Sequence, residues 1–447
     1  IISFLIAGIV CGAAVMCYAE FASMIPVAGS AYTFTYTTVG EIMAWIIGWD
    51  LILEMLMAGS VISKYWGVYL NDFMRLMGWN ANTNLTFGSF HIDIAPIIIV
   101  AFFTTLLVFG TKIGARVDGA MTVLKIAIVF FVVIVGFFYV KASNFTPFIP
   151  PSQPASTVEG SSAVTGVMTQ PLWQFATGMT PSVYGVPGIL SGAALVFFAF
   201  IGFDVVATAS EETKNPHKNV PLGIGVGMLL IIVMYMLVAV VTTGMVSYAD
   251  LAKQDSPSLA TAFELVGADW AAKIISFGIV LGLATVVMVL LLGLTRIVFA
   301  MSRDGLLPRG LSKTGKHGTP AALQIVVGAV VALVAAFFDI GVLSDMVNIG
   351  TLSAFTLVAI SIPIMRKKRP DLPRAFKMPG SPWIPILIAV ANFWLMLNLS
   401  VLTWIRFVVW LVVGFAIYFG YGYWHARLGK GDLTETLSAE TDKAVNG

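Results

Sequence analysis

The sequence predicts an all-α integral membrane protein, and its composition, hydropathy pattern and charge placement each point to that class. The 447 residues are 58% hydrophobic and 11% charged, with a mean hydropathy of +0.92. An ordinary soluble domain carries roughly 25% charged residues. No soluble fold could bury so much apolar surface, so we expect one membrane-embedded domain.

The apolar residues fall into about eleven runs of roughly 17 to 25 residues, the length that crosses a hydrocarbon layer about 30 Å thick. Their approximate limits are 1–22, 41–65, 93–110, 119–140, 187–210, 221–246, 271–300, 321–338, 342–365, 383–401 and 404–424. We expect a polytopic transmembrane domain over 1–427 and a polar cytoplasmic tail over 428–447. Most of the tryptophans near the run ends are predicted to be interfacial anchors; they are Trp45, Trp49, Trp66, Trp404 and Trp410.

Basic residues predict the orientation of the chain in the cell membrane. One set of alternate loops carries most of them: Lys112, Arg116, Lys214, Lys218, Arg303, Arg309, Lys313, Lys316, Arg366, Lys367, Lys368, Arg369, Arg374 and Lys377. The other set has only Arg75, Lys141, Lys253, Lys273 and Arg406 in or beside it. By the positive-inside rule the first set is cytoplasmic, as is the tail from about Arg427.

The start of the chain predicts a missing segment. It opens on Ile1 and Ile2, without Met and without the basic flank of a signal peptide. The first visible helix would then run from outside to inside, and a preceding helix would repair this topology. We therefore expect eleven of about twelve helices to be present. Many secondary transporters contain two inverted repeats, often of five helices each, and a second set can begin here near Gly188.

Several function classes are excluded by composition. The two cysteines, Cys11 and Cys17, lie in the first run, so neither a disulfide framework nor a metal site is expected. The histidines lie between runs or at their ends, and no run holds a nucleophile with an evident base. We expect no metal, no cofactor and no catalytic residues, and hence not an enzyme. The net charge of +2 gives no indication of a nucleic-acid partner.

The fifth run, GILSGAALVFFAFIGFDVVATASEE, is the most informative stretch. It carries Gly202 and Asp204 in the middle of an apolar segment. A charge in hydrocarbon costs at least about 2.5 kcal/mol and should face the bundle interior or a cavity, and glycine weakens a helix. We predict a helix broken at about 199–203, where freed backbone groups can bind a ligand near the bilayer midplane. The alternative is an unbroken helix in which Gly202 serves close packing.

Two further ionisable residues lie deep in apolar runs. Glu54 is near the middle of the second run, one turn beyond Asp50, and could contact a substrate or be a structural carboxylate. Lys125 lies about two turns into the fourth run. A lysine in apolar surroundings can exchange a proton near physiological pH, which makes Lys125 a candidate for ion coupling. The alternative is that its long stem reaches the nearby membrane surface.

Four stretches resemble the amino acid-polyamine-organocation superfamily, and specifically its cationic amino acid transporter branch. They are EFASMIPVAGSAYTFTYTTVGEIMAWIIGWDLILE at 20–54, FFAFIGFDVVATASEETKNPHKNVPLGI at 197–224, TRIVFAMSRDGLLP at 295–308 and NIGTLSAFTLVAISIPIMRKKRPDLPRAFKMPG at 348–380. They cover nearly the whole chain in the right order, and the last is specific to that branch.

The resemblance implies a leucine-transporter-like fold, with a 5+5 inverted repeat, two C-terminal helices and an amino acid bound between broken helices 1 and 6. The family's contacts map onto Phe198, a lid over the substrate, and onto Ile201, Asp204, Glu54 and Met288. Helix 1 is absent from the sequence, so we expect half of the binding site to be missing and this polypeptide as written to be inactive.

The resemblance also implies that a lysine on helix 5 occupies the space where sodium-coupled relatives hold a cation. That lysine maps onto Lys125. We expect protonated Lys125 to donate hydrogen bonds to carbonyls of helix 1 and to couple alternating access to protons.

The expected function is secondary active, proton-coupled import of small neutral L-amino acids such as alanine. The stretch around Met288, GLATVVMVLLLGL, has no carboxylate for a cationic side chain, and methionine suits an apolar one. Arginine or lysine transport, amino acid or polyamine exchange, and a membrane amino acid sensor or channel stay open. The expected partners are the amino acid, protons and membrane lipids, and a small membrane subunit is left open.

Overall fold

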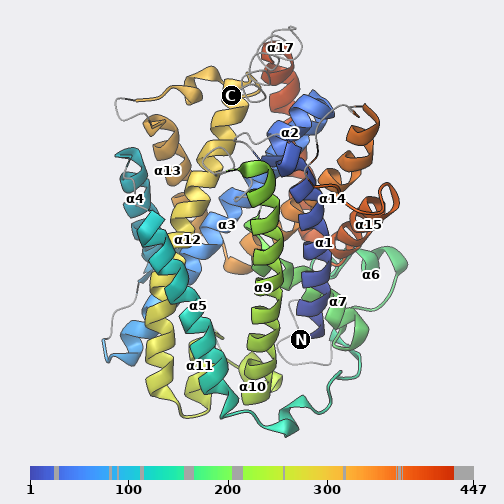
Figure 1. Cartoon of the computed structure of the whole chain (residues 1–447). Helices are drawn as coiled ribbons and strands as arrows, with labels where there is room; N and C mark the ends of the chain where they lie inside the picture. The colour runs from blue at the N-terminus through green and yellow to red at the C-terminus, as the bar shows by residue number, and fades with distance from the viewer. Residues whose placement is uncertain are drawn as a thin grey trace.

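A computed structural model describes residues 1–24, 30–79, 83–87, 90–110, 115–155, 166–203, 215–254, 257–315, 319–368, 370, 374 and 376–426. Asp204, Glu211, Glu212 and the tail 428–447 therefore lie outside the described residues. The fold is all-α within the membrane, as predicted, and its helices run mainly along one long axis (Figure 1).

The elements follow the chain in this order: α1 (Ile2–Met24), α2 (Ser30–Thr38), α3 (Glu41–Leu76), β1 (Asn84–Phe87), β2 (Phe90–Asp93), α4 (Ile94–Val108), α5 (Ala115–Phe137), a 3₁₀ turn (Ala142–Phe145), β3 (Gln153–Pro154), α6 (Leu172–Thr177), β4 (Ser182–Val183), α7 (Gly185–Val196), a 3₁₀ turn (Phe197–Phe200), α9 (Pro216–Met245), α10 (Tyr248–Ala252), α11 (Leu259–Leu265), α12 (Asp269–Arg303), a 3₁₀ turn (Arg309–Ser312), α13 (Ala321–Phe337), α14 (Ile340–Lys368), α15 (Trp383–Leu397), α16 (Val401–Ile417), a π-helical turn (Tyr418–Gly422) and α17 (Tyr423–His425). β1 pairs antiparallel with β2, and β3 with β4.

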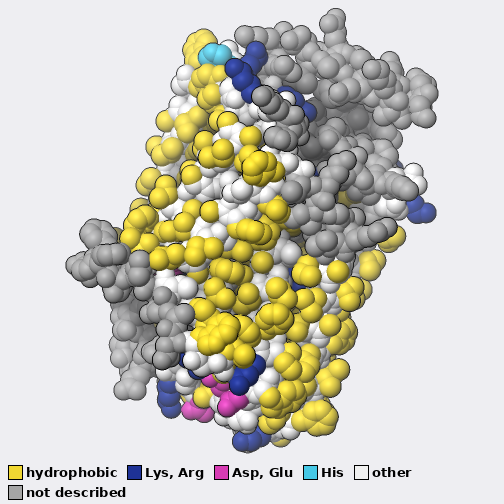
Figure 2. All heavy atoms as spheres, turned by 90° about the vertical axis from the view of Figure 1, so that its left-hand side faces the viewer, with side chains coloured by type: hydrophobic (Ala, Val, Ile, Leu, Met, Phe, Trp, Pro, Cys, Tyr) yellow, Lys and Arg dark blue, Asp and Glu magenta, His cyan; other side chains and the backbone are white. Residues whose placement is uncertain are grey.

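Each of the predicted apolar runs contains a helix. Within the described residues, α1, α3, α5, α9, α12, α14 and α16 are long and apolar enough to cross a membrane. Shorter apolar helices occupy the remaining runs: α4, α7 with its 3₁₀ turn, α13 and α15. Figure 2 shows one face of the molecule covered mainly by hydrophobic side chains, with charged side chains near its ends. This distribution fits a surface that meets lipid.

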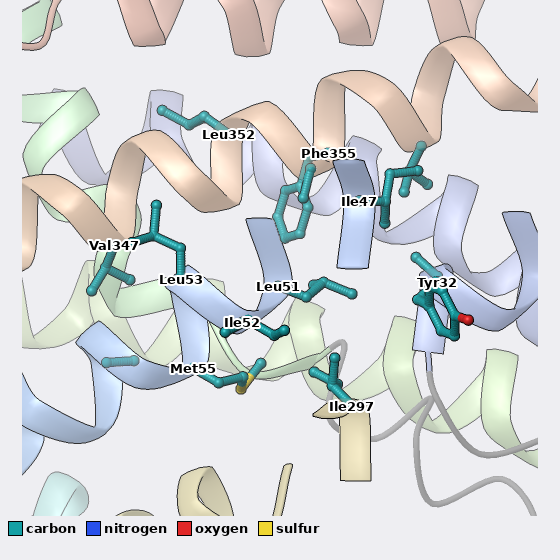
Figure 3. Packing of buried hydrophobic residues seen from close by; sticks show 14 of the residues in the cluster. Tyr32, Ile47, Leu51, Ile52, Leu53, Met55, Ile297, Val347, Leu352 and Phe355 are labelled. Atoms are coloured by element: carbon teal, nitrogen blue, oxygen red, sulfur yellow. The ribbon is translucent and has the colours of Figure 1, made fainter. Parts of the chain in front are cut away.

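Three pairs of helices that lie five spans apart along the chain pack against each other over large contacts. The first span, α1, lies against α9, the sixth; α3 lies against α12; and α4 lies against α13. Two interlocked repeats of five helices would produce this pattern, because each helix then meets its counterpart in the other repeat. The pairing supports the predicted repeat architecture. Figure 3 shows the buried side chains of α3 that face α14 and α12.

The described basic residues of the predicted cytoplasmic set gather at one end of the molecule, which we call the basic end. It holds α2, the C-terminal ends of α12 and α14, and α17, whereas α10 and α11 lie at the opposite end and residue 1 lies toward it (Figure 1). Ion pairs at the opposite end join Lys64 to Asp93 at 2.7 Å and Arg75 to Glu264 at 2.8 Å.

The prediction of interfacial anchors is wrong for Trp45 and Trp49. Both side chains are buried, and Trp49 stacks on Trp410 with ring centroids 4.4 Å apart. The Trp49 indole N–H also donates to the Trp410 carbonyl oxygen at 2.8 Å. The Trp49 and Trp410 rings fasten α3 to α16, because each indole N–H donates to the backbone carbonyl of the other residue inside the protein.

Candidate substrate-binding site

The predicted interruption of the fifth run is confirmed. α7 ends at Val196, and Phe197–Phe200 form a 3₁₀ turn in which the N–H of Ile201 donates to the Phe198 carbonyl at 3.2 Å. Ile201 is extended (φ −71°, ψ 148°), and Gly202 follows with φ +118°. An α-helix cannot continue through these angles. Glycine is required at 202 because side chains rarely adopt that φ.

Three neighbouring helices supply donors to the carbonyls around this break. Asn348 Nδ2 of α14 donates to the Leu195 oxygen at 3.2 Å, and the Tyr235 hydroxyl of α9 donates to the Ala199 oxygen at 2.6 Å. Cys11 Sγ of α1 lies 3.8 Å from the Phe200 oxygen as a weaker donor. Such partners are needed because a carbonyl released from a helix in an apolar bundle must be satisfied within the protein.

An aromatic cluster borders the same break. Phe203 makes an edge contact with Tyr18 of α1, with centroids 5.2 Å apart, and a tilted contact with Phe355 of α14 at 5.0 Å. Phe197 also meets Phe355 at 5.8 Å. Phe198 and Ile201, two predicted substrate contacts, are half-buried against this core. The rings therefore fix the interrupted segment between α1 and α14.

Two carboxylates are fully buried on α3. Glu54, a predicted substrate contact, has no exposed surface, and neither has Asp50 one turn earlier. Asp50 Oδ2 accepts a hydrogen bond from Ser353 Oγ of α14 at 2.7 Å. Among the described residues Asp50 Oδ1 has no hydrogen-bond partner. Buried acids of this kind are costly and mark functional positions in membrane proteins.

Met288 lies on α12, and Lys125 packs against the same helix. Met288 is buried on α12, with 7% of its surface exposed. The stem of Lys125, on α5, lies over Gly282 of α12, where an added Cβ would be 3.2 Å from Lys125 Cγ. Gly282 and Met288 are six residues apart, which corresponds to about 9 Å along the helix axis. The stem thus packs against α12 rather than extending along the lipid-facing side of α5.

A cavity of about 680 Å³ lies at the opposite end, beside α7. Its lining includes Ser191 and Leu195 of α7, Asp345 of α14 and Tyr248 of α10. Phe198, Ile201, Glu54, Met288 and Lys125 are not among its lining residues. The cavity therefore reaches the α7 side of the break but does not join the predicted site residues.

Sequence reasoning missed the donors that hold the break, Asn348, Tyr235 and Cys11, and it missed the Asp50–Ser353 bond. Asn348 and Tyr235 are polar groups inside apolar runs, which is a signal that a search for polar residues in spans would find. The sequence offers no signal for the carbonyl that each one meets. Within the described part of the chain, no group of three His, Cys, Asp or Glu residues could hold a metal ion.

A multi-pass helical membrane protein with an interrupted helix inside its bundle has the architecture of a transporter. The amino acid permease family model matches residues 1–421. The chain belongs to this family, which is part of the amino acid-polyamine-organocation superfamily, and it is a multi-pass plasma membrane transporter rather than an enzyme.

The relatives of this chain are named for different substrates. The chain is 42% identical over 437 residues to the branched-chain amino acid permease BcaP of Bacillus subtilis. The aligned region covers 96% of this chain and 87% of the relative. It is 38% identical over 436 residues to the methylthioribose transporter of the same organism, with the same coverage. The vacuolar cationic amino acid transporter 2 of Arabidopsis thaliana is 36% identical over 377 residues, 83% of this chain and 54% of the relative.

Proposed function

We propose that the protein imports neutral L-amino acids with apolar side chains by proton-coupled alternating access. The observation that carries the substrate class is Met288, buried on α12 in a stretch with no acidic residue between Asp269 and Asp304. A flexible, polarizable side chain accommodates an apolar group, whereas a cationic side chain needs an acid or several acceptors. Alanine is the first candidate, and the name of the B. subtilis permease adds leucine, isoleucine and valine.

In this proposal the interruption at 197–203 binds the substrate's charged backbone groups. Backbone groups near such a break can pair with an amino acid's ammonium or carboxylate. Phe198 would cover the substrate, and Ile201 would contact its side chain. Asp204, which lies outside the described residues, would complete the helix 6 contacts, and Glu54 would contact the substrate from α3.

Lys125 would couple the cycle to protons. Its packing over Gly282 supports this role, because the stem is held against α12 inside the bundle. Protonated, the ammonium would donate hydrogen bonds across the bundle and hold the substrate-ready state. Loss of the proton would remove those donors and favour release.

The second candidate is a cationic amino acid. The buried carboxylates of Asp50 and Glu54 favour it, because either could balance a guanidinium or an ammonium. Asp50 already accepts a hydrogen bond from Ser353, however, and both acids lie on α3 rather than on the α12 stretch around Met288.

Competition for uptake separates these candidates. The full-length protein is reconstituted in liposomes, and uptake of labelled alanine is measured with unlabelled alanine, leucine, arginine or methylthioribose in excess. We expect strong inhibition by alanine and leucine and little by the other two. Strong inhibition by arginine alone would assign the cationic class, and uptake of labelled methylthioribose without uptake of labelled alanine would remove amino acids as substrates.

A further inference from the structure

At the basic end, Glu20 of α1 has a fully buried carboxylate that is bonded from several directions. Arg366 of α14 donates from Nε to Glu20 Oε1 at 2.9 Å and from Nη2 to Oε2 at 2.6 Å. The backbone N–H of Met378 donates to Oε2 at 2.7 Å, and Arg374 Nε lies 3.6 Å from Oε1. This bidentate, charge-assisted geometry is the strong form of the arginine–carboxylate pair.

The segment after α14 is docked on the same end of α1 by a second set of bonds. The N–H of Phe376 donates to Ser23 Oγ at 3.3 Å, and Ser23 Oγ lies 3.4 Å from the Phe376 oxygen. Arg366 Nη2 also donates to the Met378 oxygen at 2.7 Å, so the arginine bridges α1 and this segment. The contacts with α1 join residues more than 340 positions apart in the sequence.

α1 connects these contacts to the interrupted helix. Tyr18, two residues before Glu20, meets Phe203, and Cys11 meets the Phe200 oxygen on the same helix. A movement of the segment 197–203 would therefore be transmitted to α1 through these direct contacts. The closed state of this ion pair is well defined, because a carboxylate left alone in this environment is strongly disfavoured.

We propose that Glu20, Arg366 and the N–H of Met378 form a latch that closes α1 against α14 at the basic end and must open in every transport cycle. The inference rests on the proposed transport function, since a latch that never opens would be a structural fastening only. In the described conformation the latch is closed, and α1 and α14 lie side by side at that end (Figure 1).

A reversible cross-link tests whether the latch opens. Ser23→Cys and Phe376→Cys are combined in the full-length protein, because the two residues are in contact when the latch is closed. Substrate uptake is measured before oxidation, after oxidation and after reduction, with each single variant as the control. We expect oxidation to reduce uptake by at least about tenfold and reduction to restore it. Unchanged uptake by the oxidised double variant would overturn the latch.

A second measurement does not depend on transport. Ser23→Cys is labelled with a membrane-impermeant thiol reagent added on the side of the basic end. Adding Arg366→Met should speed labelling at least about tenfold, because the latch then has lost its bidentate donor. Adding Arg303→Met, a variant of an exposed arginine at the same end, should leave the rate unchanged. Equal labelling rates in all three proteins would overturn the proposal.

Absence of uptake by the unoxidised proteins in the cross-linking experiment would instead count against the transport function.

Discussion

Gly202 is the residue on which the interrupted helix most directly depends. Its φ of +118° is accessible to glycine and disfavoured for every L side chain, although the position where a Cβ would lie has no neighbour within 4 Å. The requirement is therefore conformational rather than steric.

Replacing Gly202 by alanine should destabilise the protein by about 1–3 kcal/mol, the usual cost of a side chain in a sparsely populated backbone region. Thermal unfolding in detergent, read with uptake activity, measures the effect. Gly223→Ala is the matched control, because Gly223 is a helical position on α9 that also has open space around it. There alanine should be neutral or stabilising. Equal unfolding temperatures for the two variants would contradict the requirement.

Met288→Ala should change substrate preference if Met288 borders the substrate side chain. The shortened residue enlarges the pocket, so leucine should gain on alanine by about tenfold in the ratio of their inhibition constants. Competition assays on the reconstituted variant give this ratio. Val289→Ala, at the neighbouring and more exposed position, should leave it unchanged. The same ratio in both variants would place Met288 in the packing core only.

At the residue scale, the sequence predicted the break but not its supports. Gly202 and Asp204 within an apolar run are a local signal, and the interruption was expected at 199–203 from them alone. The donors Asn348 and Tyr235 could be found as polar residues, yet their carbonyl partners on α7 and its 3₁₀ turn depend on tertiary packing. Trp45 and Trp49 were misplaced for the same reason, since proximity to a run end does not reveal the helix that covers a ring.

At the scale of elements, the contact between α4 and α13 shows how the paired helices of the repeats approach. Gly328 of α13 faces Thr104 of α4, and an added Cβ would lie 2.7 Å from Thr104 Cγ2 and 2.9 Å from its Cβ. Real Cβ atoms do not approach so closely. The glycine therefore sets the distance between the two helices.

Gly328→Ala should lower the free energy of unfolding by about 1–3 kcal/mol, because the helices must separate or shift to admit the methyl group. Adding Thr104→Ala removes the closest atoms and should recover part of the loss. The unfolding temperatures of the two single variants and the double variant measure this coupling. Strict additivity of the two changes would contradict direct contact between these positions.

At the scale of the whole molecule, the apolar runs were predictable because each has the length that a bilayer demands. The pairing of α1 with α9, α3 with α12 and α4 with α13 is visible only in three dimensions, because no local pattern encodes it. The resemblance to a transporter family implied that architecture in advance. The latch at Glu20 had no local signal, because its partners, Arg366 on α14 and Met378 after it, lie more than 340 positions away along the chain.

Accumulation of substrate in proteoliposomes tests most directly whether a proton gradient drives uptake through Lys125. An inward proton gradient should drive labelled substrate above its equilibrium level in the full-length protein. Lys125→Met, which keeps an apolar stem over Gly282 and removes the charge, should abolish accumulation, while Lys141→Met at an exposed position should not. Retained proton-driven accumulation by Lys125→Met would contradict the coupling role, and its absence in the unmodified protein would favour a channel or a sensor.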